Sequence, residues 1–152
     1  MTWTPTLGPV LARLKVIWLA AAIGDADVIR GPTVGVGADG VLTIAYQDET
    51  LPQVGDGTSS LDGFVGNPTR ETYSINCAAG VINGDGDIEA ATDAACALWE
   101  AAGTALVADP HLNDLVLHAD MGEWSLQLTQ AADGAQAIVL FNVDIDAYTI
   151  IT

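Results

Sequence analysis

The sequence predicts an α+β domain: a mainly antiparallel sheet of about six strands with two principal helices packed on it. Apolar residues recur at helical spacing near residues 7–22 and 88–107, whereas about six other segments show strand patterns. Three of these strands precede the second helix and three follow it, an order typical of α+β folds. A chain of 152 residues is most simply one domain.

The first helix is predicted from an apolar stripe that ends before Gly24. Val16 and Leu19 lie off this stripe and give the helix a second apolar face, which we expect to be a subunit contact. The apolar run 16–23 is only eight residues long and follows two basic residues, so neither a membrane span nor a signal peptide is predicted. The stripe comprises Leu7, Leu11, Leu14, Trp18 and Ala21 or Ala22.

Two strands are predicted next, over residues 27–34 and 41–47. Between them, Gly35-Val-Gly-Ala-Asp-Gly40 matches the dinucleotide-binding pattern G-x-G-x-x-G. That pattern binds phosphate only where a strand precedes it and a helix follows it. A strand follows here, so we interpret residues 38–40 as an ordinary hairpin turn and expect no cofactor.

Residues 48–69 are predicted to form a long loop rich in Gly, Pro, Ser and Asp. Loops of this length in a compact domain are usually functional or disordered. Leu61, Phe64 and Val65 are the residues best suited to anchor it on a partner. Two interpretations stay open: the apolar residues pack back onto the core, or the loop is a projecting arm that orders on a partner.

The stretch from residue 70 to residue 110 reads as a strand, a turn and a long helix. Tyr73, Ile75 and Cys77 alternate with polar residues, which predicts a half-buried strand over residues 70–77. Asp87 is the predicted N-cap of the helix, and the helix should end at Asp109 because Pro110 follows. The helical stripe comprises Ile88, Ala91, Ala95, Leu98, Ala102 and Leu106.

Three more strands are predicted over residues 115–119, 124–129 and 136–148. An Asp-Gly turn connects the last two. The final strand contains the continuous apolar run 138–141, which is typical of a strand covered on both faces. Beyond that run, polar and apolar residues alternate, as expected of a strand that reaches a solvated edge.

The charge distribution excludes some functions. The chain carries 20 acidic and four basic residues, a net charge of −16, and no Lys or Arg follows Arg70. Nucleic-acid binders neutralise phosphates with Lys and Arg. We therefore expect no specific nucleic-acid binding, and an anionic membrane surface is disfavoured for the same reason.

No catalytic residue is predicted. The chain lacks G-x-S-x-G and lacks a Cys with a nearby His on matching elements. Asp144 and Asp146 point the same way from one strand, roughly 7 Å apart, a separation within reach of glycosidase carboxylate pairs. Nothing else resembles a sugar cleft, so we interpret them as part of a solvated acidic face.

No metal site is predicted either. His111 and His118 do not show H-E-x-x-H or related spacing. Residues 83–89 resemble the start of a calcium loop, but an isoleucine stands where its invariant glycine belongs and an alanine where its closing glutamate belongs. Cys77 and Cys96 are too few for a disulfide framework, and we expect two buried, reduced thiols.

The element order and several short phrases resemble a known family. The phrases include Glu71-Thr-Tyr-Ser-Ile-Asn-Cys77, the alanine-rich helix, Ala108-Asp-Pro-His-Leu112 and Gly134-Ala-Gln-Ala-Ile-Val-Leu-Phe-Asn-Val143. Together they are similar to the tail terminator (tail completion) proteins of long-tailed bacteriophages, particularly those of actinobacterial hosts. The likeness is strongest over residues 70–148. The near absence of basic residues in the final hairpin departs from relatives that often carry arginine there.

The resemblance implies a structural virion protein, not an enzyme, with no cofactor. It would form a homohexameric ring at the head–tail junction, after assembly in the host cytoplasm. Its partners would be other copies of itself, the major tail tube protein and a head-completion (connector) protein, with DNA passing through the ring. Another neck or tube subunit, such as a head-closure or tail tube protein, remains an alternative. So does an unrecognised acidic hydrolase.

Overall fold

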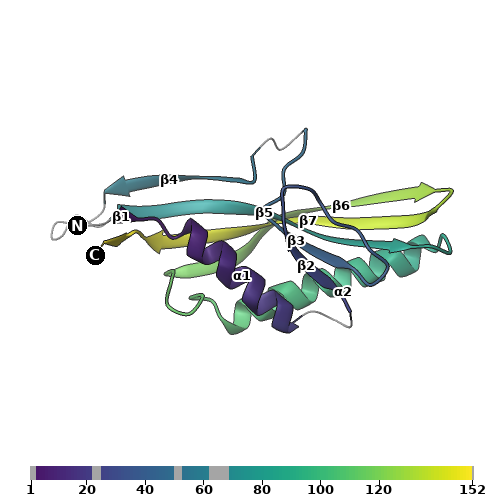
Figure 1. The fold of residues 1–152 in the computed structure, drawn as a ribbon, viewed down its shortest axis with the longest axis horizontal. Helices are drawn as coiled ribbons and strands as arrows, with labels where there is room; N and C mark the ends of the chain where they lie inside the picture. The colour runs from purple at the N-terminus through teal and green to yellow at the C-terminus, as the bar shows by residue number, and fades with distance from the viewer. Residues whose placement is uncertain (1–2, 22–24, 50–52, 62–68, 152) are drawn as a thin grey trace.

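A computed structural model describes residues 3–21, 25–49, 53–61 and 69–151 of the chain. Two helices pack on one face of a six-stranded, mixed and mostly antiparallel sheet, which confirms the predicted fold class (Figure 1). In chain order the elements are β1 (Trp3–Thr4), α1 (Leu7–Ala21), β2 (Asp27–Arg30), β3 (Val41–Ile44), β4 (Gly55–Leu61), β5 (Thr69–Asn83), α2 (Ile88–Ala108), β6 (His118–Ala131), β7 (Gly134–Tyr148) and β8 (Ile150–Ile151).

The sheet has the strand order β2-β3-β5-β7-β6, and β4 pairs with β5 on the same side as β3. β3 lies beside residues 77–80 of β5, whereas β4 lies beside residues 69–75. One edge of β5 is therefore shared by two strands. β1 and β8 form a separate two-stranded sheet.

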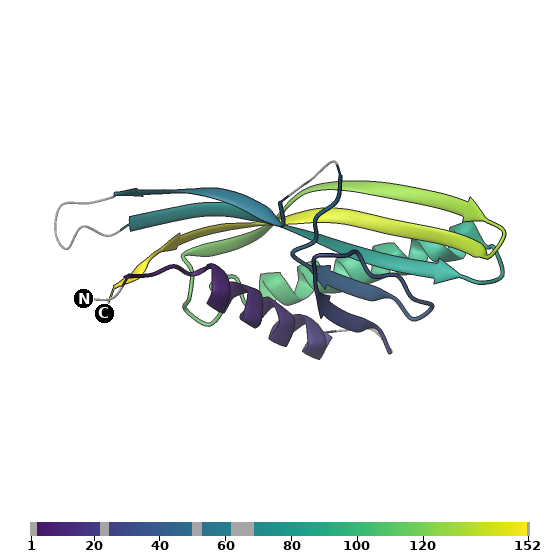
Figure 2. The same ribbon diagram turned by 45° about the horizontal axis from the view of Figure 1, so that its top comes forward.

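Two long antiparallel strands, β5 and β7, form the centre of the sheet. Each has 15 residues, so each is about 50 Å long. They pair from Arg70 opposite Tyr148 to Asn83 opposite Ala135. The strands twist strongly along this length, as Figure 2 shows. Every second residue of β7, from Ala135 to Ala147, is buried against the helices.

The helices bury the stripes that their sequences predict, with small differences. In α2 the side chain of Asp87 accepts a hydrogen bond from the backbone N–H of Ala90 at 3.0 Å, which confirms the N-cap. Ile88 is only partly buried. In α1 the buried residues are Val10, Leu14 and Trp18, whereas Leu7 is exposed. The indole N–H of Trp18 donates to the carbonyl oxygen of Ala102 at 3.1 Å and so joins the two helices.

The predicted loop over residues 48–69 contains a strand that the sequence did not indicate. β4 pairs antiparallel with the first half of β5, from Gly55 opposite Ile75 to Leu61 opposite Thr69. Its sequence, Gly-Asp-Gly-Thr-Ser-Ser-Leu, has low strand propensity and no apolar alternation. The strand depends on its partner β5 and not on local preference. Phe64 and Val65 lie outside the described residues.

The hairpin predicted between β2 and β3 is wrong, because these strands pair parallel. After Arg30 the chain leaves the sheet and returns to place Val41 beside Asp27. On the way Gly37 forms a parallel bridge with Val81. Residues 38–40 do turn the chain, but they turn it within a crossover.

The strand predicted over residues 115–119 is also wrong in its limits. Leu112, Asn113 and Asp114 adopt left-handed backbone conformations, with φ of 45°, 56° and 63°, and residues 115–117 stay outside the sheet. β6 then runs from His118 to Ala131, with a register shift between Met121 and Trp124. The predicted strand over residues 124–129 is confirmed as part of this longer one.

Candidate interaction surfaces

A buried polar network fixes the segment that leads into α1. The backbone N–H and the hydroxyl of Thr6 both donate to Oε2 of Glu71, at 3.1 and 2.5 Å. The hydroxyl of Tyr73 lies 2.9 Å from that of Thr6. Glu71 is 4% exposed, so three polar groups satisfy one another away from solvent. Burial raises the pKa of Tyr73 to about 12, so its phenol stays protonated at neutral pH.

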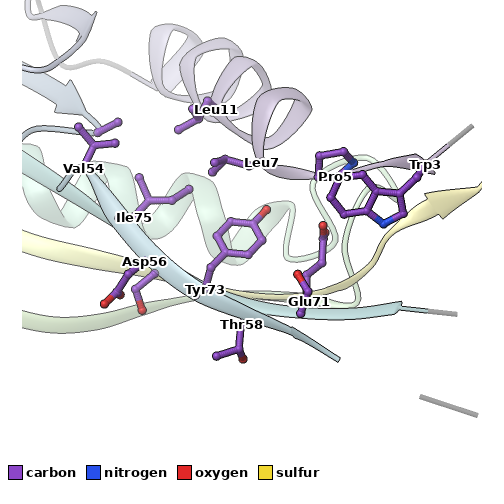
Figure 3. A pocket seen from close by; sticks show the side chains of 15 residues that line it. Trp3, Pro5, Leu7, Leu11, Val54, Asp56, Thr58, Glu71, Tyr73 and Ile75 are labelled. Atoms are coloured by element: carbon purple, nitrogen blue, oxygen red, sulfur yellow. The ribbon is translucent and has the colours of Figure 1, made fainter. Parts of the chain in front are cut away.

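Beside this network lies an apolar groove of about 300 Å³ between the start of α1 and the β4–β5 pair (Figure 3). We call it the α1–β4 groove. The side chain of Tyr73 extends toward α1, whereas that of Thr58 points away from it. The apolar side chains that line the groove are Trp3, Pro5, Leu7, Leu11, Ala45, Val54, Tyr73 and Ile75.

The β4 wall of this groove carries almost no side-chain bulk. Gly55, Gly57 and Ser59 pair with Ile75, Tyr73 and Glu71, so they share the helix-side face of the sheet. A Cβ at Gly57 would meet Tyr73, and a Cβ at Gly55 would meet the carbonyl oxygen of Ser74. Close packing on β5 therefore requires glycine at both positions. Because glycine has no side chain, these two positions also leave the groove open.

The second surface is a row of apolar side chains on β6, which we call the β6 ridge. Trp124, Leu126 and Leu128 are 61%, 38% and 51% exposed. They pair with Phe141, Val139 and Ala137 of β7, which places them on the helix side of the sheet. The ring of Trp124 contacts that of Trp99 in α2, with centroids 5.4 Å apart. Within the described ranges, β6 has no strand partner on its outer edge.

The sequence predicted a strand over residues 124–129, in which apolar and polar residues alternate, but gave no sign that its apolar face is exposed. A period-2 pattern shows which side chains share a face. It does not show whether the same chain covers that face or another chain does.

The third surface is the predicted second apolar face of α1. Val16 and Leu19 are each 54% exposed, away from the buried stripe of that helix. Their role as a subunit contact stays a prediction. Leu61 ends β4, but its side chain is outside the described residues, so the predicted loop contact of Leu61, Phe64 and Val65 also stays a prediction.

The two carboxylates considered as a catalytic pair each bind a partner from β5. Asp144 accepts a hydrogen bond from the hydroxyl of Ser74 at 2.6 Å. Asp146 accepts two from the guanidinium of Arg70, at 2.9 and 2.6 Å. The hydrogen bonds from Arg70 hold the pKa of Asp146 below its usual value. Such a residue is an ionised structural partner and not an acid poised to donate a proton.

The histidines and cysteines also lie apart. Nε2 of His118 is 2.8 Å from a carboxylate oxygen of Asp120, and Nδ1 of His111 is 2.8 Å from the carbonyl oxygen of Leu117. Nowhere in the described part of the chain do three metal-ligating side chains gather. Both cysteines are free thiols, but only Cys77 is buried. The expectation of two buried thiols is thus wrong for Cys96, which is partly exposed.

Two further findings concern membrane helices and similarity to known proteins. No helix among the described residues is long and apolar enough to cross a membrane. Neither a protein-family model nor a curated protein matches this chain.

Proposed function

We propose that this chain is a structural virion protein, a tail terminator that forms a ring, most simply of six subunits. The ring would cap the tail tube and join it to the head-completion (connector) protein. The proposal starts from the resemblance over residues 70–148 and from the absence of a predicted catalytic or cofactor site.

The observation that carries the proposal is the placement of two different exposed apolar surfaces at opposite ends of the central β5–β7 pair. The α1–β4 groove lies beside β4, and the β6 ridge lies on the edge strand β6. β5 and β7 separate β4 from β6. When two different surfaces of identical copies meet, the contact is head to tail, and it closes into a ring if the rotation returns to its start.

A ring subunit in a tail also has to contact proteins above and below the ring. The exposed pair Val16 and Leu19 on α1 provides a third apolar surface, separate from the other two. A monomer with no partners would not need several such surfaces, whereas a subunit that contacts several neighbours in an assembly would need them.

The charge also supports a role around DNA that does not involve binding it. Thirteen acidic residues and no Lys or Arg follow Arg70. In a ring through which a genome passes, acidic side chains facing the lumen would repel phosphate and prevent adhesion. We expect no salt-dependent retention of the protein on duplex DNA at physiological ionic strength, and such retention would count against the proposal.

The mass of the assembled protein tests the proposal. Native mass spectrometry should find a closed oligomer of six copies of the 15.7 kDa chain. Long tubes in place of a discrete oligomer would favour a tail tube protein. A chain that stays monomeric at high concentration and in the presence of tail tubes would contradict the ring.

A further inference from the structure

We propose that β4 of one copy pairs antiparallel with β6 of the next copy, with the β6 ridge seated in the α1–β4 groove. This inference rests on the proposed ring and names the contact that closes it. The occupant of the groove is then a second copy of the same chain.

Strand direction permits this pairing within one continuous sheet. β4 is antiparallel to β5, β5 to β7, and β7 to β6. β4 and β6 of one chain therefore run in opposite directions. A second copy can therefore place its β4 antiparallel to residues 124–128 of the first copy's β6, with the helix sides of both strands on the same face. This copy is shifted along the strands relative to the first, because Thr58 lies level with Thr72 of β5, whereas Gln127 lies level with Gly80.

On the helix side, the two strands have matched spacing and opposite side-chain size. β6 presents large apolar side chains at Trp124, Leu126 and Leu128, every second residue. β4 presents Gly55, Gly57 and Ser59 at the same spacing, next to the apolar groove. Large side chains opposite small ones leave room for the ridge to enter the groove. Buried aromatic anchors of this kind usually carry most of the energy of an interface.

On the opposite side, both strands are polar and compatible. Asp56 and Thr58 of β4 share that face with Ser74 and Thr72 of β5. β6 presents hydroxyl and amide groups there, from Ser125, Gln127 and Thr129. These groups can donate to the carboxylate of Asp56, which is the only charged residue of β4.

The local charge at this place permits a second copy as the occupant. Two chains that each carry a net charge of −16 repel one another, and the repulsion is smallest where acidic residues are scarce at the contact. From Trp124 to Ala131, β6 contains no charged residue. The opposite edge strand, β2, is a poorer partner for β6 because its four residues include Asp27 and Arg30.

Disulfide trapping tests the contact. Cys96→Ala removes the partly exposed native thiol, and Thr58→Cys is then combined in turn with Ser125→Cys, Gln127→Cys or Thr129→Cys to sample the register. A link within one chain is excluded because three strand spacings, roughly 14 Å, exceed the ~7 Å limit between Cα atoms of a disulfide. We expect at least one pair to form a ladder of covalent oligomers on oxidation. Each single-cysteine variant should form none.

A charge variant tests the ridge independently. Leu126→Glu should raise the concentration needed for assembly at least about tenfold, because it places an acid in a desolvated contact. Val107→Glu is the matched control: it adds the same charge at an exposed apolar residue of α2. We expect the control to assemble like the wild type.

Three results would overturn the contact. Cross-linking of the single Gln127→Cys variant would indicate twofold β6–β6 pairing. A ring of the expected mass without a link in any of the three pairs would refute the contact and leave the proposed function standing. A monomer under every condition would refute both.

Discussion

The substitution Thr6→Val tests the account of how the N-terminal segment is held. Valine keeps the shape of the side chain and removes the hydroxyl that donates to Glu71 at 2.5 Å. The nearly buried carboxylate then keeps only the backbone N–H of Thr6 among the donors described above. A hydrogen bond to a charged group contributes about 1.5–3 kcal/mol. We expect a loss of about 2 kcal/mol in the free energy of unfolding, or roughly 4–8 °C in Tm for a domain of this size.

The same substitution elsewhere in the chain provides the controls. Thr149 is buried, and its hydroxyl finds no partner in the described part of the chain, so Thr149→Val should leave stability unchanged or raise it. Thr58 is exposed, and Thr58→Val should change stability by less than about 0.5 kcal/mol. Urea denaturation followed by circular dichroism measures all three variants. A Thr6→Val variant as stable as the wild type, or a Thr149→Val variant as unstable as Thr6→Val, would contradict this role of the Thr6 hydroxyl.

Three further outcomes follow from single groups. Asp87→Ala should cost about 1 kcal/mol in thermal or urea unfolding because it removes the N-cap of α2; an unchanged midpoint would contradict the cap. Burial raises the pKa of Cys77 to about 12, so iodoacetamide followed by peptide mass spectrometry should label Cys96 in the folded protein and Cys77 only after unfolding. Because Arg70 lowers the pKa of Asp146, their pair stabilises the fold above the ordinary carboxyl pKa, and this contribution is lost as pH falls through the folded-state value. The difference in unfolding free energy between the wild type and Asp146→Asn should therefore shrink as pH falls from about 6 to about 2, whereas a constant difference would show that the pair contributes nothing.

Local signals in the sequence were sufficient for the α2 region. The cap at Asp87, the apolar stripe and the proline after Asp109 are all local features, and each defines a boundary or a face without information from the rest of the chain. The predicted helix and the observed one, Ile88–Ala108, agree closely for this reason.

The elements that the sequence missed depend on distant partners. β4 is a strand because residues 69–75 of β5 provide its hydrogen bonds, although Gly55 and Gly57 argue locally for a loop. The parallel pairing of β2 and β3 depends on where the crossover returns the chain, which the turn residues themselves do not specify. The presence of a strand could be predicted where apolar and polar residues alternate. The strand with which it pairs, and the direction of that pairing, could not be predicted.

The interaction surfaces divide in the same way. Val16 and Leu19 could be singled out because they lie off a helical stripe, and both are exposed. The β6 ridge has the same alternation as a buried strand, and only the position of β6 at the sheet edge reveals that it is exposed. The groove is formed by α1, β4 and β5 together, so no single stretch of sequence carries its signal.

Electron microscopy of the purified wild-type protein tests the central claim most directly, because it shows symmetry and shape together. Class averages should contain closed rings with a central channel and one copy number, most simply six. Particles of monomer size in every class, or open filaments without closure, would contradict a ring-forming tail terminator.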